Sequence, residues 1–400
     1  MKSKVVYTEE TDFMEDAAEE ILEGFEDFSL QKNSLAIVFA EDIVDYPELY
    51  RYLSSEWDFP VIGCTALGMI MGGRRGFESS GITVMVMTGD ECRFAAGITE
   101  SLTPENHKEY IRECYQKLSN EIDGDEKIVI AYGNCVTENN LVSGDDLLRA
   151  TDEASGNKPI FGGLASDNLN FQKMRVFYND RAVENGEVMA LIGGDVKPLY
   201  RHINSVKRMP SGVTHRITKS ERNIVYELDG EPIVDVLTRD NFNVTKGDVL
   251  RDYLMNPFII TIDEPDGSRI EAARNLSFVD KEKNCGVFLG FMPEGAVLEF
   301  GYADRDYVKS TLKEIMFGML DEVKKSDYPY HTVLCTSCAS RYLVMSSQID
   351  QVAQGYVPEL PEGSGFLGFY SYGEFCPVSM AKSSQEYNMF HNFTYVLLAL

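Results

Sequence analysis

The feature of this sequence that most constrains its fold is a strand-like segment that runs directly into a glycine turn, and it occurs three times. Each segment joins a short apolar run to one or more glycines with small or polar neighbours; the three are Pro60–Ala66, Pro159–Ala165 and Gly365–Glu374. Glycine at such a point lets the backbone turn with a positive φ angle, or lets a ligand approach the main chain closely. The repetition favours one site that the three turns share.

The first two segments align without gaps and have similar surroundings. Each is preceded by an apolar strand, Leu35–Ala40 or Lys127–Tyr132, and then by a polar segment with helical potential. Each is followed by two strands in a hairpin-like arrangement, residues 82–87 with 92–98 and residues 174–178 with 188–192. We therefore expect the N-terminal half to be a diverged duplication, with the commonness of glycine turns in α/β proteins as the alternative explanation.

A looser third copy closes the chain. Residues 332–335 read as a buried strand, a helix is expected within 347–356, and residues 366–372 and 393–398 read as further strands. The sequence thus predicts an α/β (α+β) protein of two related domains. Their sheets are mixed and largely antiparallel, helices pack outside, and a strand-helix-strand-strand unit repeats.

Apolar stripes place the main helices. Asp304 is expected to cap a helix that runs to about Lys324, and Thr103-Pro104 is expected to begin another. Phe13 and the apolar residues that follow it at helical spacing predict an early third helix. These stripes indicate core packing rather than a cofactor site.

Composition limits the classes of partner. With 400 residues and 44% hydrophobic content the chain has material for two cores. The formal net charge of −27 disfavours binding to nucleic acid or to anionic membrane surfaces. Neither a membrane-length apolar run nor a signal-peptide pattern is present, which predicts a cytoplasmic protein without membrane insertion. The basic stretch Val206–Gly212 suggests a crossover near residues 205–222, so we expect an extension (1–34) and two domains (35–210 and 211–400).

Several short motifs resemble the FIST proteins, a sensory family of signal transduction. The N-terminal half is similar through Gly63–Ala66 and through Gly162–Asn168 leading to Val176–Asn179. The second half is similar through Val225–Gly230, Ala273–Asn275, Cys335–Arg341, Gly368–Glu374 and His391–Thr394. The resemblance spans roughly Leu35 to Leu400, and it implies a sensor of small ligands, with amino acids proposed for the family. The chain departs from many relatives by lacking an appended kinase, cyclase or receptor segment, so we expect a stand-alone sensor that signals through a partner or through a change in association state.

Candidate ligand-binding residues lie beside these turns. Arg274 and Arg341 follow strand ends, where an arginine can hold a carboxylate in bidentate fashion, and Glu374 is placed to receive an ammonium group. The alternative is that these charges pair with one another and fix the domain. Further polar or glycine positions complete the expected pocket: Gly63, Cys64, Thr65, Gly163, Asp167, Asn168, Cys335, Tyr370, Tyr372 and Gly373.

Two other functions stay open. Cys64 or Cys335 is suitably placed for a thiol nucleophile, but no histidine stands at a spacing that indicates a base, and standard catalytic motifs are absent. Cys335 and Cys338 form a Cys-x-x-Cys without the two further ligands that zinc requires, so a turn lining a pocket is expected there. Some similar proteins bind haem and respond to nitric oxide; His202, His215, His331 or His391, or else a cysteine, would be the axial ligand in that case.

Overall fold

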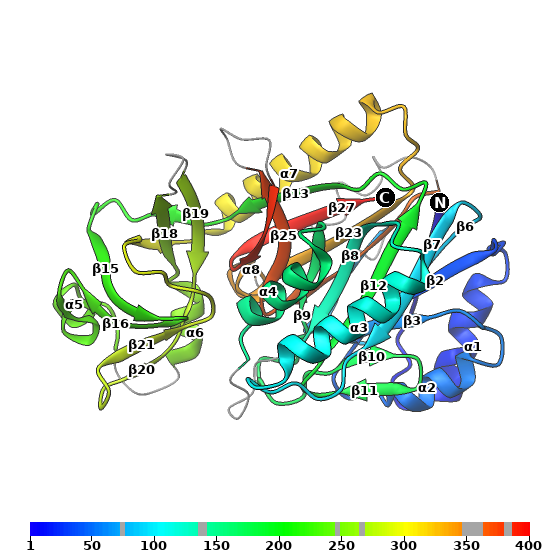
Figure 1. Cartoon of the computed structure of the whole chain (residues 1–400), viewed down its shortest axis with the longest axis horizontal. Coiled ribbons are helices and arrows are strands. Elements are labelled where there is room, and N and C mark those ends of the chain that lie inside the picture. The colour runs from blue at the N-terminus through cyan, green and yellow to red at the C-terminus, as the bar shows by residue number, and fades with distance from the viewer. Residues whose placement is uncertain (73–76, 135–141, 245–248, 264–268, 346–362, 380–385) are drawn as a thin grey trace.

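The computed structural model describes residues 1–72, 77–134, 142–244, 249–263, 269–345, 363–379 and 386–400, and these form two lobes of unequal size (Figure 1). The larger lobe contains residues from both ends of the chain, whereas the smaller lobe is built from residues 207–302. The predicted mixed α/β class with two domains is confirmed. The repeated strand-helix-strand-strand unit stays a prediction.

Three six-stranded sheets make up the larger lobe. Across the first sheet the order is β1 (Lys2–Thr8), β6 (Ile82–Gly89), β2 (Asn33–Ala40), β3 (Val61–Thr65), β10 (Val176–Tyr178) and β11 (Arg181–Val183). Across the second it is β26 (Glu386–His391), β25 (Glu374–Ser379), β9 (Ile160–Leu164), β8 (Glu126–Gly133), β12 (Glu187–Gly194) and β7 (Cys92–Ile98). Across the third it is β13 (Leu199–Asn204), β27 (Thr394–Ala399), β23 (Thr332–Cys338), β24 (Gly365–Ser371), β4 (Met69–Met71) and β5 (Phe77–Glu78).

A parallel pair stands in the middle of each sheet: β2 with β3, β8 with β9, and β23 with β24. Parallel neighbours need a crossover connection, which contains α2 (Tyr46–Leu53), α4 (Gly144–Ser155) or α8 (Ala339–Met345). An antiparallel strand, β6, β12 or β27, flanks the first member of each pair. The helix expected within residues 347–356 lies outside the described residues.

The outer edge of each parallel pair is completed by a strand from elsewhere in the chain. Strand β3 pairs with β10, which follows β9; β9 pairs with β25, which follows β24; and β24 pairs with β4, which follows β3. The borrowed edges thus form a closed cycle around the three sheets. This exchange brings the glycine turns at the ends of β3, β9 and β24 into one region.

The expected hairpins after the first two turns are wrong. Strand β6 pairs with β1 and β2, whereas β7 pairs with β12 of another sheet. In the same way, β10 and β12 belong to different sheets. Nearly every residue of β6 and β12 is buried, as in strands covered on both faces. Such strands lack the alternation of apolar and polar residues that would indicate their partner. The chain therefore reverses at Gly89-Asp90, but the two strands on either side of this turn do not pair with each other.

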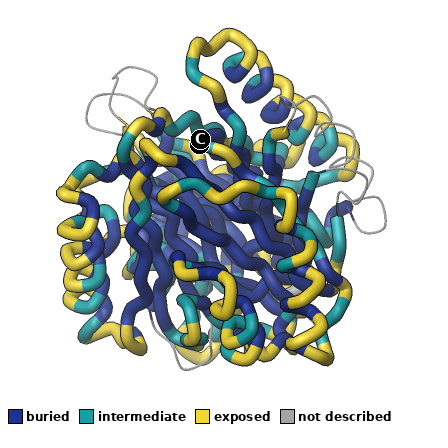
Figure 2. Tube along the Cα trace, turned by 90° about the vertical axis from the view of Figure 1, so that its right-hand side faces the viewer, coloured by how far each residue is buried: buried dark blue, intermediate teal, exposed yellow. Residues whose placement is uncertain are grey.

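The core of the larger lobe lies where the three sheets face one another. Phe39 on β2, Tyr132 on β8 and Phe369 on β24 meet there, with ring centroids 4.4 Å apart for Phe39 and Phe369 and 5.4 and 5.6 Å for the pairs with Tyr132. Large buried aromatic rings of this kind contribute much of a core's stability. Figure 2 shows the buried strands enclosed by helices with exposed outer faces.

Each sheet carries helices on its outer side. Helix α1 (Met14–Phe25) packs with α2 beside the first sheet, α3 (His107–Glu121) with α4 beside the second, and α7 (Arg305–Lys325) with α8 beside the third. The predicted cap of α7 is confirmed, because the Tyr307 N–H donates to Asp304 Oδ1 at 2.8 Å. Helix α3 begins a few residues later than expected. No helix within the described ranges is long and apolar enough to cross a membrane.

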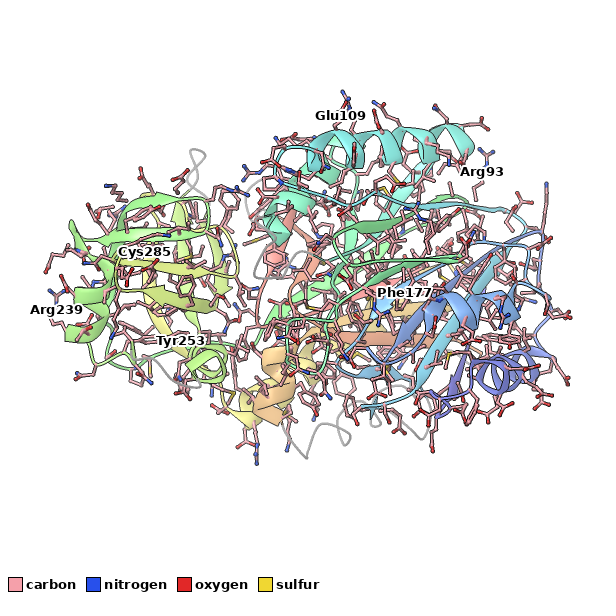
Figure 3. The ribbon with its side chains drawn as sticks, turned by 90° about the horizontal axis from the view of Figure 1, so that it is seen from below. Arg93, Glu109, Phe177, Arg239, Tyr253 and Cys285 are labelled. Carbon is pink, nitrogen blue, oxygen red and sulfur yellow. The ribbon has the colours of Figure 1, made fainter. Side chains whose placement is uncertain are left out.

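The smaller lobe has a nine-stranded sheet of its own, with two short helices. Its strands are β14 (Lys207–Arg208), β15 (Thr214–Glu221), β16 (Ile224–Leu228), β17 (Glu231–Pro232), β18 (Phe258–Asp263), β19 (Arg269–Arg274), β20 (Leu276–Asp280), β21 (Cys285–Phe288) and β22 (Val297–Tyr302). Its helices are α5 (Ile233–Arg239) and α6 (Val249–Met255). In Figure 3, Arg239, Tyr253 and Cys285 mark this lobe, and Phe177 lies within the larger one.

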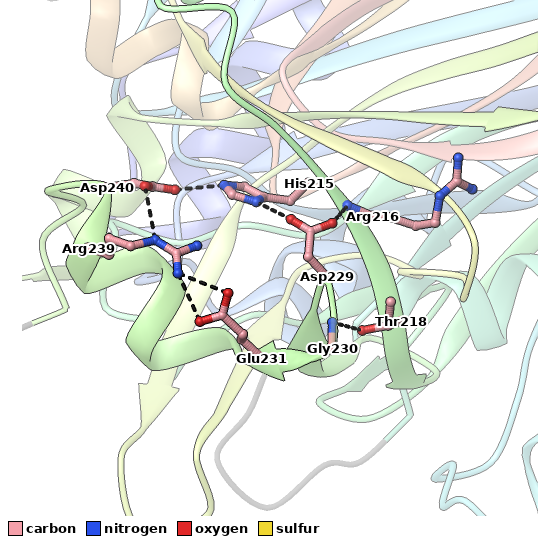
Figure 4. A network of polar contacts seen from close by, with 8 residues as sticks. All are labelled: His215, Arg216, Thr218, Asp229, Gly230, Glu231, Arg239 and Asp240. Carbon is pink, nitrogen blue, oxygen red and sulfur yellow. Dashed lines mark hydrogen bonds and ion pairs between the residues drawn. The ribbon is translucent and has the colours of Figure 1, made fainter.

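A polar network fixes one corner of the smaller lobe (Figure 4). His215 is buried between two carboxylates, with Nδ1 2.7 Å from Asp229 and Nε2 2.7 Å from Asp240. Burial raises the pKa of Asp229, but hydrogen bonds from the Arg216 N–H and from His215 outweigh burial and lower it. Both ring nitrogens of His215 are therefore engaged in holding the lobe together.

Candidate functional site

The three glycine turns meet at Ser166. The Ser166 hydroxyl accepts from the Leu67 N–H at 2.8 Å and donates to the Tyr370 carbonyl, and the Ser166 N–H donates to the Thr65 carbonyl at 3.0 Å. The Leu164 N–H also donates to the Gly373 carbonyl at 2.8 Å. The structure thus brings the predicted turns side by side. Ser166 lies within the Gly162–Asn168 motif, but no local pattern indicates that it joins the turns.

Close strand packing explains the glycines of these turns. A Cβ atom on Gly63 would stand 1.8 Å from the Val38 carbonyl oxygen, and one on Gly162 would stand 1.9 Å from that of Ala131. A Cβ on Gly163 would stand 2.5 Å from the Gly373 carbonyl oxygen. These contacts are between main chains, so the glycines allow neighbouring strands to approach rather than opening space for a ligand.

Asp167 and Tyr372 are held by each other and by the backbone. The Asp167 carboxylate accepts four main-chain N–H bonds of 2.8–3.1 Å from residues 170–173, and the Tyr372 hydroxyl donates to it at 2.7 Å. Burial raises the pKa of Asp167, but these hydrogen bonds outweigh burial and lower it. Asp167 therefore shapes the loop after β9, while its neighbour Asn168 is exposed.

Arg274 lies at the contact between the lobes. Its guanidinium donates to the carbonyls of Phe291 at 3.1 Å, Ala273 at 2.9 Å and Phe390 at 3.3 Å. Asp145, at the start of α4, is the nearby carboxylate; burial raises its pKa to about 6, and Arg274 offsets part of that shift. Carbonyl groups of both lobes thus occupy Arg274, and these contacts are not shared with Arg341.

Arg341 lies at the carboxyl end of the parallel strand β23, in the first turn of α8. It is 2% exposed, its Nη1 donates to the Ser205 hydroxyl, and its guanidinium lies 5.2 Å from the centre of the Tyr395 ring. Burial lowers the pKa of Arg341, and nearby Tyr370, Tyr395, Cys338 and Glu374 oppose that shift. Carboxyl ends of parallel strands are where open α/β sheets bind ligands.

Glu374 follows the third turn and belongs to the same electrostatic group. The Ser371 hydroxyl donates to its Oε1 at 2.8 Å, and the Thr394 N–H donates to Oε2 at 3.3 Å. Burial raises the pKa of Glu374 to about 8, although these bonds, the Cys338 thiol and Arg341 each offset part of the shift. Glu374 is thus a buried carboxyl group near the edge of ionisation at neutral pH.

Four polar atoms in the segment that carries Arg341 are buried and have no hydrogen-bond partner among the described residues. They are Thr336 Oγ1, Ser337 Oγ, Ser340 Oγ and Arg341 Nε. Buried polar atoms in native proteins are nearly always hydrogen-bonded to protein or to ordered solvent. We call residues 336–341 together with Glu374 the Arg341 cluster. Sequence reasoning identified its two charged members but not its hydroxyl groups.

The pKa values of the buried cysteine thiols are raised, which makes these thiols poor nucleophiles. Cys64 and Cys335 are 0% and 1% exposed, and burial raises the pKa of Cys64 well above its ordinary value and that of Cys335 to about 12. Burial likewise raises the pKa of Cys338 to about 12. A reactive cysteine requires the opposite shift. Tyr370, by contrast, packs among aromatic rings, 5.6 Å from Phe77.

The histidines considered for haem stand in different surroundings. Both nitrogens of His215 contact carboxylates, and His391 is buried with Nε2 3.1 Å from the Cys376 carbonyl. His202 reaches solvent and lies 5.1 Å from His391 between ring centroids, and surrounding protein lowers its pKa. The main chain of His331 bonds to Leu400 and Gly365. Among these four, His202 is the most accessible candidate ligand for a metal.

Glu374→Gln is expected to change how stability depends on pH. With a folded pKa of about 8 and an unfolded value near 4.5, the folded state holds a proton that the unfolded state has lost. Unfolding free energy therefore falls as pH rises through this window, and the amide removes that contribution. Urea unfolding at about pH 5 and about pH 8 should show a smaller loss for the variant than for the wild-type protein. Equal losses would place the pKa of Glu374 outside this window.

Comparison with known proteins gives two family matches. The FIST N domain model matches residues 34–231, and the FIST C domain model matches residues 234–377. A curated relative, an uncharacterized protein of Methanocaldococcus jannaschii, is 26% identical over 233 residues. That alignment covers 54% of this chain and 41% of the relative, so the chain matches less than half of the relative's length.

Two solved structures of cyanuric acid hydrolases show a weak similarity. The enzyme from A. caulinodans has a TM-score of 0.30 at 10% identity, over 65% of this chain and 79% of that one. A second has a TM-score of 0.35 at 9% identity, with both chains fully covered. At these scores the similarity carries no argument about this chain.

Proposed function

Because the chain belongs to the FIST family, whose domains imply a sensor-type role in small-ligand binding, we propose that the Arg341 cluster is its ligand site. The observation that carries this proposal is the set of buried polar atoms without partners at residues 336–341. A ligand beside Arg341 with acceptor and donor groups satisfies those of the atoms that share its face of β23 and offsets the free energy that their burial costs. The position at the carboxyl end of β23 supports the same location.

The charges of the cluster favour a small zwitterion such as an amino acid. Arg341 Nε is a buried cationic donor without a partner among the described residues, which suits a ligand carboxylate. Glu374 is the carboxyl group nearby, and an ammonium group beside it stabilises its ionised form. We omit Arg274 and Asp167 from this ligand set because protein groups already occupy them.

The experiment that tests the proposal is native mass spectrometry of the purified protein, followed by calorimetry with the standard amino acids. We expect a small organic mass that leaves on denaturation, or binding of one amino acid in the titration. Arg341→Lys and Glu374→Gln should each weaken binding about tenfold or more, because each removes a charge-assisted hydrogen bond. Arg341→Lys is preferred to alanine because it keeps the buried charge.

Glu187→Gln is the matched control. Glu187 is buried, its Oε1 accepts from Thr151 at 2.6 Å, and burial raises its pKa to about 8, as for Glu374. It lies beneath helix α4, away from the Arg341 cluster, so it should alter stability and leave ligand affinity unchanged. Unchanged affinity in both cluster variants would contradict the proposed location. A bound mass with haem absorbance would instead favour the gas-sensor alternative.

A further inference from the structure

A groove of about 660 Å³ lies on the surface of the larger lobe, between α1 and the residues at and after the end of α2. Its wall follows α1 from Glu15 to Glu26 and continues to Phe28 and Leu30, and the opposite wall comes from the residues around Trp57. Phe25 and Trp57, 5.6 Å apart between ring centroids, form an apolar floor. We call this the α1 groove, and its lining is separate from the Arg341 cluster.

The rim of the α1 groove is acidic. Five exposed glutamates line it, and its lining contains no lysine or arginine: Glu15, Glu19, Glu23, Glu26 and Glu56. As far as the structure describes the chain, none of the five takes part in an ion pair. Glu15, Glu19 and Glu23 follow one another at a spacing of four residues, where like charges on a helix repel.

Two of these carboxylates are also unfavourably placed along the helix axis, whereas Glu15 lies in the favourable first turn. Glu23 and Glu26 lie near the C-terminal end of α1, which already carries partial negative charge, and the last turn holds no basic residue. The C-terminal end of α1 therefore has an uncompensated negative field beside an apolar floor. A cationic partner that lies along the helix relieves both the repulsion and the dipole.

Exposed apolar side chains stand at both ends of the same helix. Phe13, directly before α1, is 66% exposed, and Leu30, which lines the groove, is 46% exposed. Large apolar side chains at the surface, bordered by polar ones, are typical of protein interaction sites. The twelve residues from Glu15 to Glu26 extend the wall by about 16 Å, or three helical turns.

We propose that the α1 groove binds a lysine- or arginine-rich amphipathic helix of a partner protein. Basic side chains of that helix lie along the glutamate rim while its apolar face covers Leu22, Phe28 and the aromatic floor, the helix-in-groove mode of recognition. Charge disfavours a second copy of this chain as the occupant, since each copy carries a formal net charge of −27. The inference is independent of the ligand proposed for the Arg341 cluster.

Trp57 makes the test specific to the groove, because it is the single tryptophan of the chain. The probe is a synthetic leucine/lysine peptide of about 14 residues without aromatic residues, long enough to span the groove as a helix. Titration should shift or quench the Trp57 emission, with an affinity that falls as salt rises from about 0.05 to about 0.3 M. A scrambled peptide of the same composition and a leucine/glutamate peptide should leave the emission unchanged.

Two double variants separate groove binding from general attraction to an acidic protein. Glu19→Lys with Glu23→Lys should weaken peptide binding about tenfold or more, since two rim contacts become repulsive. Glu109→Lys with Glu113→Lys changes net charge equally on the exposed face of α3, where Figure 3 shows Glu109 pointing outward, and should leave binding nearly unchanged. Circular dichroism would first establish that both variants are folded.

Three results would overturn the proposal. If both double variants weakened peptide binding equally, the peptide would be attracted by net charge alone. If the scrambled peptide bound as tightly as the amphipathic one, the groove would not recognise an amphipathic helix. Sedimentation measures whether the wild-type protein self-associates. If it does, and if Glu19→Lys/Glu23→Lys abolishes that association, a second copy of the chain would be the occupant instead.

Discussion

Gly63→Ala is expected to yield no stably folded protein. The substituted Cβ atom would stand 1.8 Å from the Val38 carbonyl oxygen. Val38 is the register partner of Gly63 in the parallel strand β2, and Phe177 of β10 pairs on the other side. Neither neighbouring strand can move away without breaking its backbone hydrogen bonds to β3. The loss of unfolding free energy should therefore exceed about 4 kcal/mol, more than most single substitutions cause. That is a large part of the roughly 5–15 kcal/mol that stabilises a domain.

Gly318→Ala is the matched control for this prediction. Gly318 lies within α7, and a Cβ atom there would be 3.8 Å from its nearest neighbour, the Arg201 guanidinium. The substitution should raise stability by up to about 1 kcal/mol through helix propensity. Soluble yield and thermal unfolding of the two variants provide the measurement. A Gly63→Ala protein that unfolds within a few degrees of wild type would show that β2 and β3 separate easily.

Asp167→Ala should destabilise the protein by roughly 3–5 kcal/mol, because removing a buried, fully bonded carboxylate leaves its donors without acceptors. Those donors are the four N–H groups of residues 170–173 and the Tyr372 hydroxyl. The folded pKa of Asp167 lies below its ordinary value of 3.8, so its stabilising effect is complete at neutral pH. That effect is lost as pH falls through the folded pKa.

Asp167→Asn is the informative companion to the alanine variant. The amide keeps one acceptor oxygen and replaces the other with a donor, so two of the four N–H bonds should be lost and the cost should be intermediate. Urea unfolding of both variants at neutral pH measures the order. If either variant kept wild-type stability but lost ligand binding, Asp167 would be a ligand contact and its role in shaping the loop would be minor.

The sequence predicted elements better than it predicted their partners. Asp304 marked the start of α7 because a cap acts on the next few residues of the same chain. Strands β6 and β7 were recognised as strands, but their pairing was not, since both are largely buried and the partner of each lies far along the chain. The cyclic exchange of sheet edges has no signature within a window of neighbouring residues.

The candidate site shows the same limit. Arg341 and Glu374 were singled out from their places beside turns, and the structure puts them into one electrostatic group. Arg274 and Asp167 were singled out by the same rule, yet carbonyls and backbone N–H groups occupy them. A charged side chain beside a glycine turn looks alike in both cases, because the main-chain atoms that satisfy it are set by tertiary structure.

Because the three sheets exchange edge strands, the order in which the strands are synthesised differs from the order in which the sheets can assemble. Strand β4 emerges from the ribosome early, but its partner β24 is almost three hundred residues further along the chain. In the same way, β9 is synthesised well before its partner β25. The nascent chain therefore presents open sheet edges for most of its translation, the condition in which strands pair with the wrong neighbours. The larger lobe can close only after synthesis has passed β27, so neither half expressed alone holds a complete set of its sheets.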